Sequence, residues 1–244
     1  MSASLTGRTV LVVGRGGGIA RAATLAIRAA GADVVVAGRD QKALAEAYDD
    51  PGITAEAVDL TDEASIAALA ERLGTVDHVV STASARARGQ VGDLSPETVT
   101  LSFQTKVIGP ILLAKHFAPR MPSDGSFVLF SGSSARKPTI GMLAVGATNA
   151  AADTVTRSLA VELAPIRVNA ISPGTIDTGA YDALGEHKKA AVFAARTEQN
   201  PARRIGTSED VADAVVFALT NTFVTGVSLG VDGGEPLVGK EKAT

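Results

Sequence analysis

The sequence predicts a doubly wound α/β fold, with a mostly parallel seven-stranded sheet and helices on both faces. Two observations carry this prediction. Short apolar runs of strand length alternate with longer helical patterns along the chain. The strand candidates are continuous stretches of Val, Ile and Leu, which is typical of a parallel sheet that helices cover on both faces. In such a sheet, ligands bind at the carboxyl ends of the strands.

The expected elements follow one another in regular order. The strand candidates are Thr9–Val13, Asp33–Ala37, Thr54–Val58, His78–Ser81, Phe127–Ser131, Arg167–Ile171 and Val227–Val231. The helical candidates are Ala20–Ala30, Gln41–Ala47, Asp62–Leu73, Pro96–Ala118, Ala144–Leu163 and Ser208–Leu219. We expect a single domain over residues 1–244, because no linker, repeat or low-complexity tract divides the chain. The one long insertion, Gly179–Asn200, is polar and helical in character, and we expect it to lie over the ligand site as a lid.

The turn after the first strand is the most informative stretch of the sequence. Glycines occupy positions 14, 16, 17 and 18, between an apolar strand and a helix-forming stretch. A glycine turn at a helix N-terminus brings bare backbone N–H groups close to a pyrophosphate, and the helix dipole favours the negative charge. This strand–turn–helix unit predicts a Rossmann-like fold that binds a dinucleotide. Taken alone the turn is a weak indication, because ordinary strand–helix connections also use glycine.

Composition excludes several classes of site and partner. The chain has 244 residues, a formal net charge of -3 and no cysteine. The lack of cysteine excludes disulfides, thiolate metal ligands and thiol catalysis, and we expect no metal site. No basic patch indicates a nucleic-acid partner. Because no apolar run approaches ~18 residues and the first residues have no signal-peptide core, we expect a cytoplasmic protein that does not enter the membrane.

Further motifs, in their order along the chain, resemble the short-chain dehydrogenase/reductase family nearly from end to end. The turn 14–20 is similar to the family's GxxxGxG motif, with Ala20 in place of the last glycine. Asp59-Leu60 resembles the pair that contacts adenine, and 172–178 resembles the segment that holds the nicotinamide carboxamide. Segments 201–212 and 225–234 resemble the approach to the last helix and the last strand. The resemblance implies these cofactor-binding residues: Gly14, Arg15, Gly18, Ile19, Arg39, Asp59, Leu60, Ala83, Asn149, Pro173, Gly174, Ile176 and Thr178.

The end of the second strand indicates NADP(H) rather than NAD(H) as the cofactor. Members of the family that prefer NAD usually place an acid there to bind the ribose 2′-hydroxyl, whereas this chain has Gly38 followed by Arg39. A guanidinium can pair with a 2′-phosphate, and Arg15 adds a second positive charge. Asp40 is an opposing charge, but as a helix cap it would point away from the cofactor.

The catalytic positions depart from the family pattern. The family uses a tyrosine as proton donor and, four residues later on the same helix face, a lysine that lowers the tyrosine pKa and binds ribose. The resemblance places Val145 at the tyrosine position and Asn149 at the lysine position. Gly132 falls at the position of the catalytic serine, and Lys106 falls at that of the helix asparagine. The resemblance therefore implies a divergent member that lacks the usual Tyr/Lys pair.

Four residues are candidates to replace the missing groups. Lys106 either supplies a buried ammonium with a lowered pKa or is a solvated lysine. Ser131 and Ser133 either donate to a substrate carbonyl or only solvate the strand end. Asn149 retains hydrogen-bonding capacity toward ribose hydroxyls without a charge.

Residues around these positions offer weaker candidates. Tyr181 and His187 either close over substrate or lie on the surface of the lid, and Arg86 and Arg88 either meet an anionic substrate or sit in a solvated loop. Two functions remain open at this stage. One is an atypical NADP(H)-dependent oxidoreductase acting on a small carbonyl or alcohol, and the other is an inactive NADP(H)-binding sensor or partner subunit. Small and apolar residues around the helices 96–118 and 144–163 predict a homotetramer or homodimer.

Overall fold

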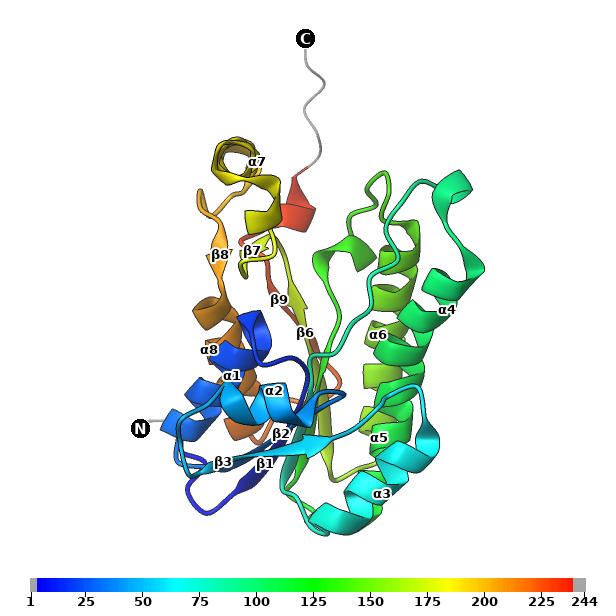
Figure 1. Cartoon of the computed structure of the whole chain (residues 1–244), viewed down its shortest axis with the longest axis vertical. Coiled ribbons are helices and arrows are strands. Elements are labelled where there is room, and N and C mark those ends of the chain that lie inside the picture. Colours follow the sequence, from blue (N-terminus) through cyan, green and yellow to red (C-terminus); the bar gives the residue numbers. More distant parts are fainter. Residues whose placement is uncertain (1–3, 239–244) are drawn as a thin grey trace.

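The computed structural model describes residues 4–238, which form seven parallel strands with helices on both sides (Figure 1). The strands of this sheet are β1 (Thr9–Val13), β2 (Asp33–Gly38), β3 (Ile53–Ala57), β4 (His78–Ser81), β5 (Ser126–Phe130), β6 (Arg167–Pro173) and β9 (Ser228–Val231). Their order is β3-β2-β1-β4-β5-β6-β9, and all pairings are parallel. The predicted doubly wound, Rossmann-like sheet is confirmed.

Alternation along the strands explains the two helical layers. Val10 and Val12 of β1 face one apolar cluster, whereas Leu11 and Val13 face another. Helices α1 (Gly18–Ala29) and α8 (Ser208–Thr220) cover the first face, and α2 (Gln41–Glu46) adds Leu44 at its edge. Helices α3 (Glu63–Leu73), α5 (Gly109–Phe117) and α6 (Leu143–Glu162) cover the second face. Helices therefore bury both faces of the sheet, as the continuous apolar strands predict.

The predicted helix Pro96–Ala118 is interrupted, and this corrects the expectation of one regular helix. It consists of α4 (Pro96–Phe103), a π-helical turn (Gln104–Ile108) and α5. Pro110 has no N–H, so it cannot bond to the carbonyl of Lys106 in the usual pattern. The N–H of Gly109 reaches back to the carbonyl of Gln104 instead, which widens the helix by one residue.

A short pair of strands and a further helix lie beyond the carboxyl ends of the sheet. Strands β7 (Ile176–Asp177) and β8 (Gly206–Thr207), which the sequence did not predict, pair in parallel. Between them α7 (Glu186–Gln199) forms within the segment 179–200 and has no buried residue. Figure 1 shows α7 at the far end of the molecule from α3. None of the helices between residues 4 and 238 has the length and apolar character that a membrane crossing needs.

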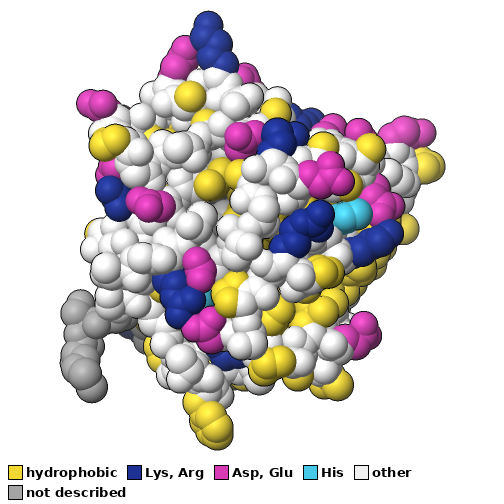
Figure 2. Space-filling view, turned by 90° about the horizontal axis from the view of Figure 1, so that it is seen from below, with side chains coloured by type: hydrophobic (Ala, Val, Ile, Leu, Met, Phe, Trp, Pro, Cys, Tyr) yellow, Lys and Arg dark blue, Asp and Glu magenta, His cyan; other side chains and the backbone are white. Residues whose placement is uncertain are grey.

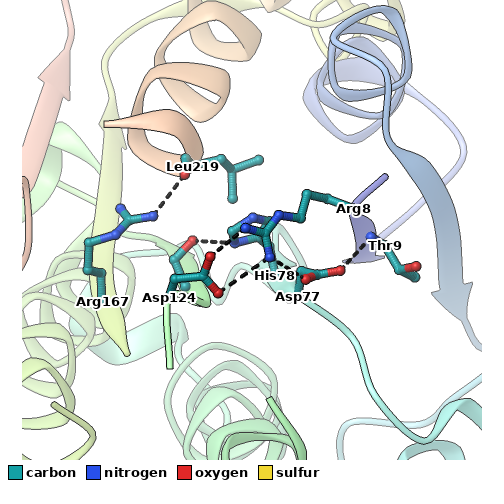
Figure 3. Close-up of polar contacts among 8 residues, drawn as sticks. Arg8, Thr9, Asp77, His78, Asp124, Arg167 and Leu219 are labelled. Carbon is teal, nitrogen blue, oxygen red and sulfur yellow. Dashed lines mark hydrogen bonds and ion pairs between the residues drawn. The ribbon is translucent and has the colours of Figure 1, made fainter. Parts of the chain in front are cut away.

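The amino ends of the strands are joined by a polar cluster (Figure 3). Arg8 pairs with Asp77 at 2.7 Å and also with Asp124. His78 Nδ1 lies 2.8 Å from the Ser126 hydroxyl, which ties β4 to β5. Figure 2 views the molecule from this end, where basic and acidic side chains lie next to one another.

Arg167 completes the amino-end cluster. It donates three hydrogen bonds of 2.8 to 2.9 Å to the last carbonyls of α8 and the residue after it: those of Ala218, Leu219 and Asn221. The arginines of this cluster are therefore already paired with groups of the chain itself.

Candidate functional site

A glycine cradle connects β1 to α1. Gly17 precedes the first turn of α1 in an extended conformation, and no side chain caps the helix there. Gly18 has φ +55°, a left-handed conformation that favours glycine, and a Cβ at Gly17 would meet nothing within 4 Å. The first turn of α1 therefore has no side-chain cap, and the space beside Gly17 is open. This arrangement fits a phosphate group, as the sequence predicted.

The segment after β6 lies against this cradle. A Cβ built on Gly18 would be 3.3 Å from the side chain and 3.4 Å from the backbone of Thr178. Ile176 is buried in β7, and Pro173 ends β6 next to Gly174. The structure thus brings together two segments that lie about 160 residues apart in the sequence. Both were predicted to bind the cofactor, at its pyrophosphate and its nicotinamide.

The residues predicted at the adenosine end also gather at one edge of the sheet. Arg39 follows β2 and lies within electrostatic range of Asp59. Hydrogen bonds from the backbone N–H and hydroxyl of Thr61 hold the pKa of Asp59 below its usual value, and Arg39 lowers it further. Asp40 caps α2 by accepting from the Ala43 N–H at 2.9 Å, so its carboxylate is occupied by the helix. Within residues 4–238, Arg39 donates no hydrogen bond to the protein.

The remaining predicted cofactor residues contribute packing as well as backbone. Ile19 packs on the apolar cluster beside α1, and Ala83 packs on the cluster of the opposite face. Leu60 is buried and lies against Gly109, at the end of the π-helical turn. Any contact that these three make with a nucleotide would therefore come chiefly from their backbone.

Lys106 is buried at the carboxyl end of β5, and only 8% of the residue is exposed. Its ammonium donates to the carbonyl of Ser131 at 3.0 Å. Burial, together with the positive charge of Arg86, lowers the pKa of Lys106 to about 7, and the charge of Asp153 opposes this change. A group with this pKa exists in both protonation states near neutral pH, which suits proton transfer.

Asn149 and Ser131 lie beside this ammonium. The Ser131 hydroxyl donates to the backbone carbonyl of Asn149 at 3.1 Å. The Asn149 amide nitrogen donates to the Ser134 hydroxyl at 2.7 Å, while its Oδ1 is buried and has no partner in the described chain. A Cβ at Gly132 would lie 2.6 Å from the Asn149 Nδ2, so glycine at this position makes room for the amide. The orphaned Oδ1 is an acceptor that a ribose hydroxyl would satisfy.

Ser133 is not part of this cluster. It lies in a single 3₁₀ turn, Ser133–Ala135, where its carbonyl accepts from the N–H groups of Arg136 and Lys137. Hydrogen bonds bring together Lys106, Ser131 and Asn149, and within residues 4–238 Ser133 takes part only in backbone bonds to the turn that follows it. Ser134, which the sequence analysis did not single out, takes the place beside the Asn149 amide.

No tyrosine or lysine occurs in α6, where Val145 is buried one turn before Asn149. The chain's two tyrosines lie elsewhere. Tyr48 packs beside the cluster covered by α1, under the Arg21 guanidinium. Tyr181 lies at the start of the segment 179–200 and contacts Phe193 of α7, with ring centroids 5.1 Å apart. His187, also on α7, is exposed.

Two more residues near Lys106 escaped sequence reasoning. Asp153 lies one turn after Asn149 on α6, and its Oδ1 is buried without a partner in the described chain. Thr105 accepts a hydrogen bond of 3.1 Å from the Ala85 N–H, which attaches the loop after β4 to the π-helical turn. The i to i+4 spacing of Asn149 and Asp153 on a helix of small residues was the available indication of a polar face.

Comparisons with known proteins agree with this geometry. A family model described as enoyl-(acyl carrier protein) reductase matches residues 13–235. L-xylulose reductase of Mus musculus is 30% identical over 244 residues, covering 96% of this chain and 98% of the relative. The 1-cyclohexenylcarbonyl-CoA reductase of Streptomyces collinus is 33% identical, covering 93% of this chain and 86% of the relative.

A solved structure has a similar fold. The crystal structure of a small-chain dehydrogenase in complex with NADPH is 31% identical and superposes with a TM-score of 0.79, covering 95% of this chain and 99% of the other. Together with the family model, these matches extend over both the glycine cradle and the segment after β6. The chain belongs to the short-chain dehydrogenase/reductase family of oxidoreductases.

Proposed function

We propose that the protein is an NADP(H)-dependent oxidoreductase of a small carbonyl or alcohol, in which Lys106 is the proton donor. The observation that carries the proposal is the buried Lys106 ammonium, 3.0 Å from the Ser131 carbonyl and next to Asn149. It is a titratable group at the carboxyl end of the sheet, where the helix α6 has neither tyrosine nor lysine.

The cofactor residues follow from the cradle. The N–H groups at Gly17 and Gly18 would hold the pyrophosphate, and the orphaned Asn149 Oδ1 would accept a ribose hydroxyl. Arg39, with Arg15, would pair with the 2′-phosphate of NADP(H), and the NADPH complex of the structural relative supports this choice. When bound, the nicotinamide supplies the hydride that adds to the carbonyl carbon.

The protein's own contribution is the proton. In carbonyl reduction, the Lys106 ammonium gives one proton to the carbonyl oxygen, which becomes the alcohol, and the neutral amine takes a proton back from water. The Ser131 carbonyl holds the Nζ in place through its 3.0 Å hydrogen bond. In alcohol oxidation, the neutral amine accepts the hydroxyl proton. The segment 179–200 would act as a lid, because no residue of α7 is fully buried and the helix is held to the rest of the chain mainly by polar contacts such as Lys189–Asp177.

The test is a pair of lysine substitutions. Lys106→Met should lower the turnover of ketones, quinones or alcohols with NADP(H) by about 10²–10⁴-fold, while NADPH affinity changes little. Lys42→Met removes the same charge from an exposed position on α2, next to Glu46, and should leave turnover unchanged. Equal turnover in wild type and Lys106→Met would contradict the proposed role.

Cofactor preference has its own measurement. By calorimetry, Arg39→Ala should weaken NADPH binding by about 10–100-fold, since a charge-assisted contact is lost, and should leave NADH binding nearly unchanged. NADH binding as tight as NADPH binding in the wild type would overturn the preference.

The absence of tyrosine and lysine from α6 favours a second candidate, an NADP(H)-binding sensor or partner subunit without turnover. The same assays separate the two. Tight NADPH binding with no turnover across the ketone, quinone and alcohol panel would favour the sensor.

The proposed assembly is a homotetramer or homodimer through the α4–α5 and α6 helices. Ile108, Ile111 and Val161 are 46%, 40% and 79% exposed on these helices, which leaves apolar side chains in water in a single chain. Burial between copies would remove this exposure. Light scattering that gives the mass of one chain at micromolar concentration would refute the proposal.

A further inference from the structure

The loop after β4, at the carboxyl end of the sheet, carries two guanidinium groups. It runs from Thr82 to Gly89 and contains Arg86 and Arg88, separated by Ala87. Ala87 is 4% exposed, so it anchors the loop, while both arginines are exposed on either side of it. Within residues 4–238, neither guanidinium donates a hydrogen bond or forms an ion pair.

Two hydrogen bonds hold this loop in place. The Ala85 N–H donates to the Thr105 hydroxyl at 3.1 Å, and the Gly89 N–H donates to the carbonyl of Gly141 at 3.0 Å. Thr105 is the sequence neighbour of Lys106, as Ala85 is of Arg86. The first bond therefore joins the Arg86 loop to the turn that carries Lys106, and the Arg86 guanidinium lies within electrostatic range of the Lys106 ammonium.

The surroundings of Arg86 are electrically unfavourable without a further group. Its partial burial and the positive charges of Arg88 and Arg15 lower the pKa of Arg86, and only Tyr181 among its neighbours acts in the opposite sense. Lys106 adds another positive charge nearby. Like charges this close repel one another unless an anion is present.

Asp153 acts on Lys106 but is not among the charges that act on Arg86, and the acidic residues on the other side of the site already have partners. Asp177 pairs with Lys189 at 2.9 Å, and Asp232 pairs with Arg136 at 2.7 Å. Glu235 accepts from the Thr175 N–H at 2.8 Å. These carboxylates are already occupied by groups on their own side of the site.

We propose that the substrate carries an anionic group, a carboxylate or a phosphate, and that Arg86 binds this group while Lys106 faces the carbonyl of the same molecule. The proposal rests on the proposed function, because it assigns the substrate class of that site. A planar guanidinium forms two parallel hydrogen bonds to a carboxylate or phosphate, which fixes the orientation of the substrate as well as its affinity. Arg88, at the outer side of the loop, steers the anion toward the site.

The experiment compares compounds that differ in one charge. Binding to the NADPH complex is measured by calorimetry for 4-oxopentanoate against its methyl ester, and for dihydroxyacetone phosphate against dihydroxyacetone. At least one anionic member should bind about tenfold tighter than its neutral partner, and which pair responds tells carboxylate from phosphate. Arg86→Gln should remove the difference, whereas Arg120→Gln, which removes the same charge at the other end of the sheet, should retain it.

The outcomes are distinguishable. If both members of each pair bind equally, or none binds, the anion site is wrong while the proposed function stands. If Arg86→Gln weakens NADPH binding as strongly as substrate binding, the arginine serves a cofactor phosphate, and the proposal is overturned. A wild-type chain that binds no NADPH removes the proposed function and this proposal with it.

Discussion

The basic side chains at the amino end of the parallel sheet and those around Lys106 at its carboxyl end are in opposite situations. At the amino end, Arg167 donates to three carbonyls and Arg8 pairs with two carboxylates. At the carboxyl end, Lys106 donates to one carbonyl, and Arg86 has no partner in the described chain. Helices cover both faces of the sheet, so the helical layers do not explain the difference between its two ends. Charges satisfied within the chain stabilise the fold, whereas unsatisfied ones remain available to a ligand at the cost of stability.

The largest expected effect comes from breaking the amino end. Arg167→Leu leaves the carbonyls of Ala218, Leu219 and Asn221 without their donor in a buried environment. We expect the free energy of unfolding to fall by about 3 kcal/mol, since several buried acceptors lose their hydrogen bonds. Urea unfolding measures the change, with Arg120→Leu as the control for loss of one exposed positive charge. NADPH affinity of the folded variant should be unchanged, and a fall in that affinity would link the two ends.

The pH dependence of the free energy of unfolding tests His78, which also lies at the amino end of the sheet. Burial lowers the pKa of His78 to about 4, and the histidine of an unfolded chain titrates near 6.5. Between these values the unfolded state binds a proton that the folded state does not, so stability falls as the pH falls from 6.5 toward 4. The loss should reach about 2 kcal/mol at pH 5.

Urea midpoints at pH 6.5 and pH 5 measure this loss, and His78→Gln should remove most of it. A slope that survives in the variant would assign the acid sensitivity to groups other than His78.

The strands were predictable because the apolar pattern that forms them is local. Every predicted strand of the large sheet appears within two residues of its expected bounds, as with Arg167–Ile171 against Arg167–Pro173. The interruption between α4 and α5 was not predicted, although Pro110 stood in the predicted helix. A proline in a helix predicts a kink or a break, but not the wide turn that forms here.

The candidate site was predictable in position but not in contacts. Lys106 and Asn149 were singled out where the family pattern places its catalytic groups. The hydrogen bond from Lys106 to Ser131 joins residues 25 positions apart, on a helix and a strand end, and no spacing rule gives it. Ser134 was missed for the same reason, because only the folded chain shows that the amide of Asn149 occupies the space at Gly132.

The sharpest test of the comparison is the effect of Lys106→Met on stability. The buried ammonium has a pKa of about 7, whereas a lysine in an unfolded chain titrates near 10.4. From pH 7 to about 10 the unfolded state binds more protons, so wild-type stability should rise with pH in this window. Methionine fills a similar space without a charge, and we expect it to raise the free energy of unfolding at pH 7 by about 1–2 kcal/mol. The gain should shrink as the pH approaches 10, because removing the proton from the lysine on folding then costs less free energy. Urea unfolding of the cofactor-free protein at pH 7 and pH 9.5 measures both quantities. The change in the free energy of unfolding would then be negative for Arg167→Leu at the amino end and positive for Lys106→Met at the carboxyl end. A Lys106→Met variant that is less stable than the wild type at pH 7 would contradict this comparison.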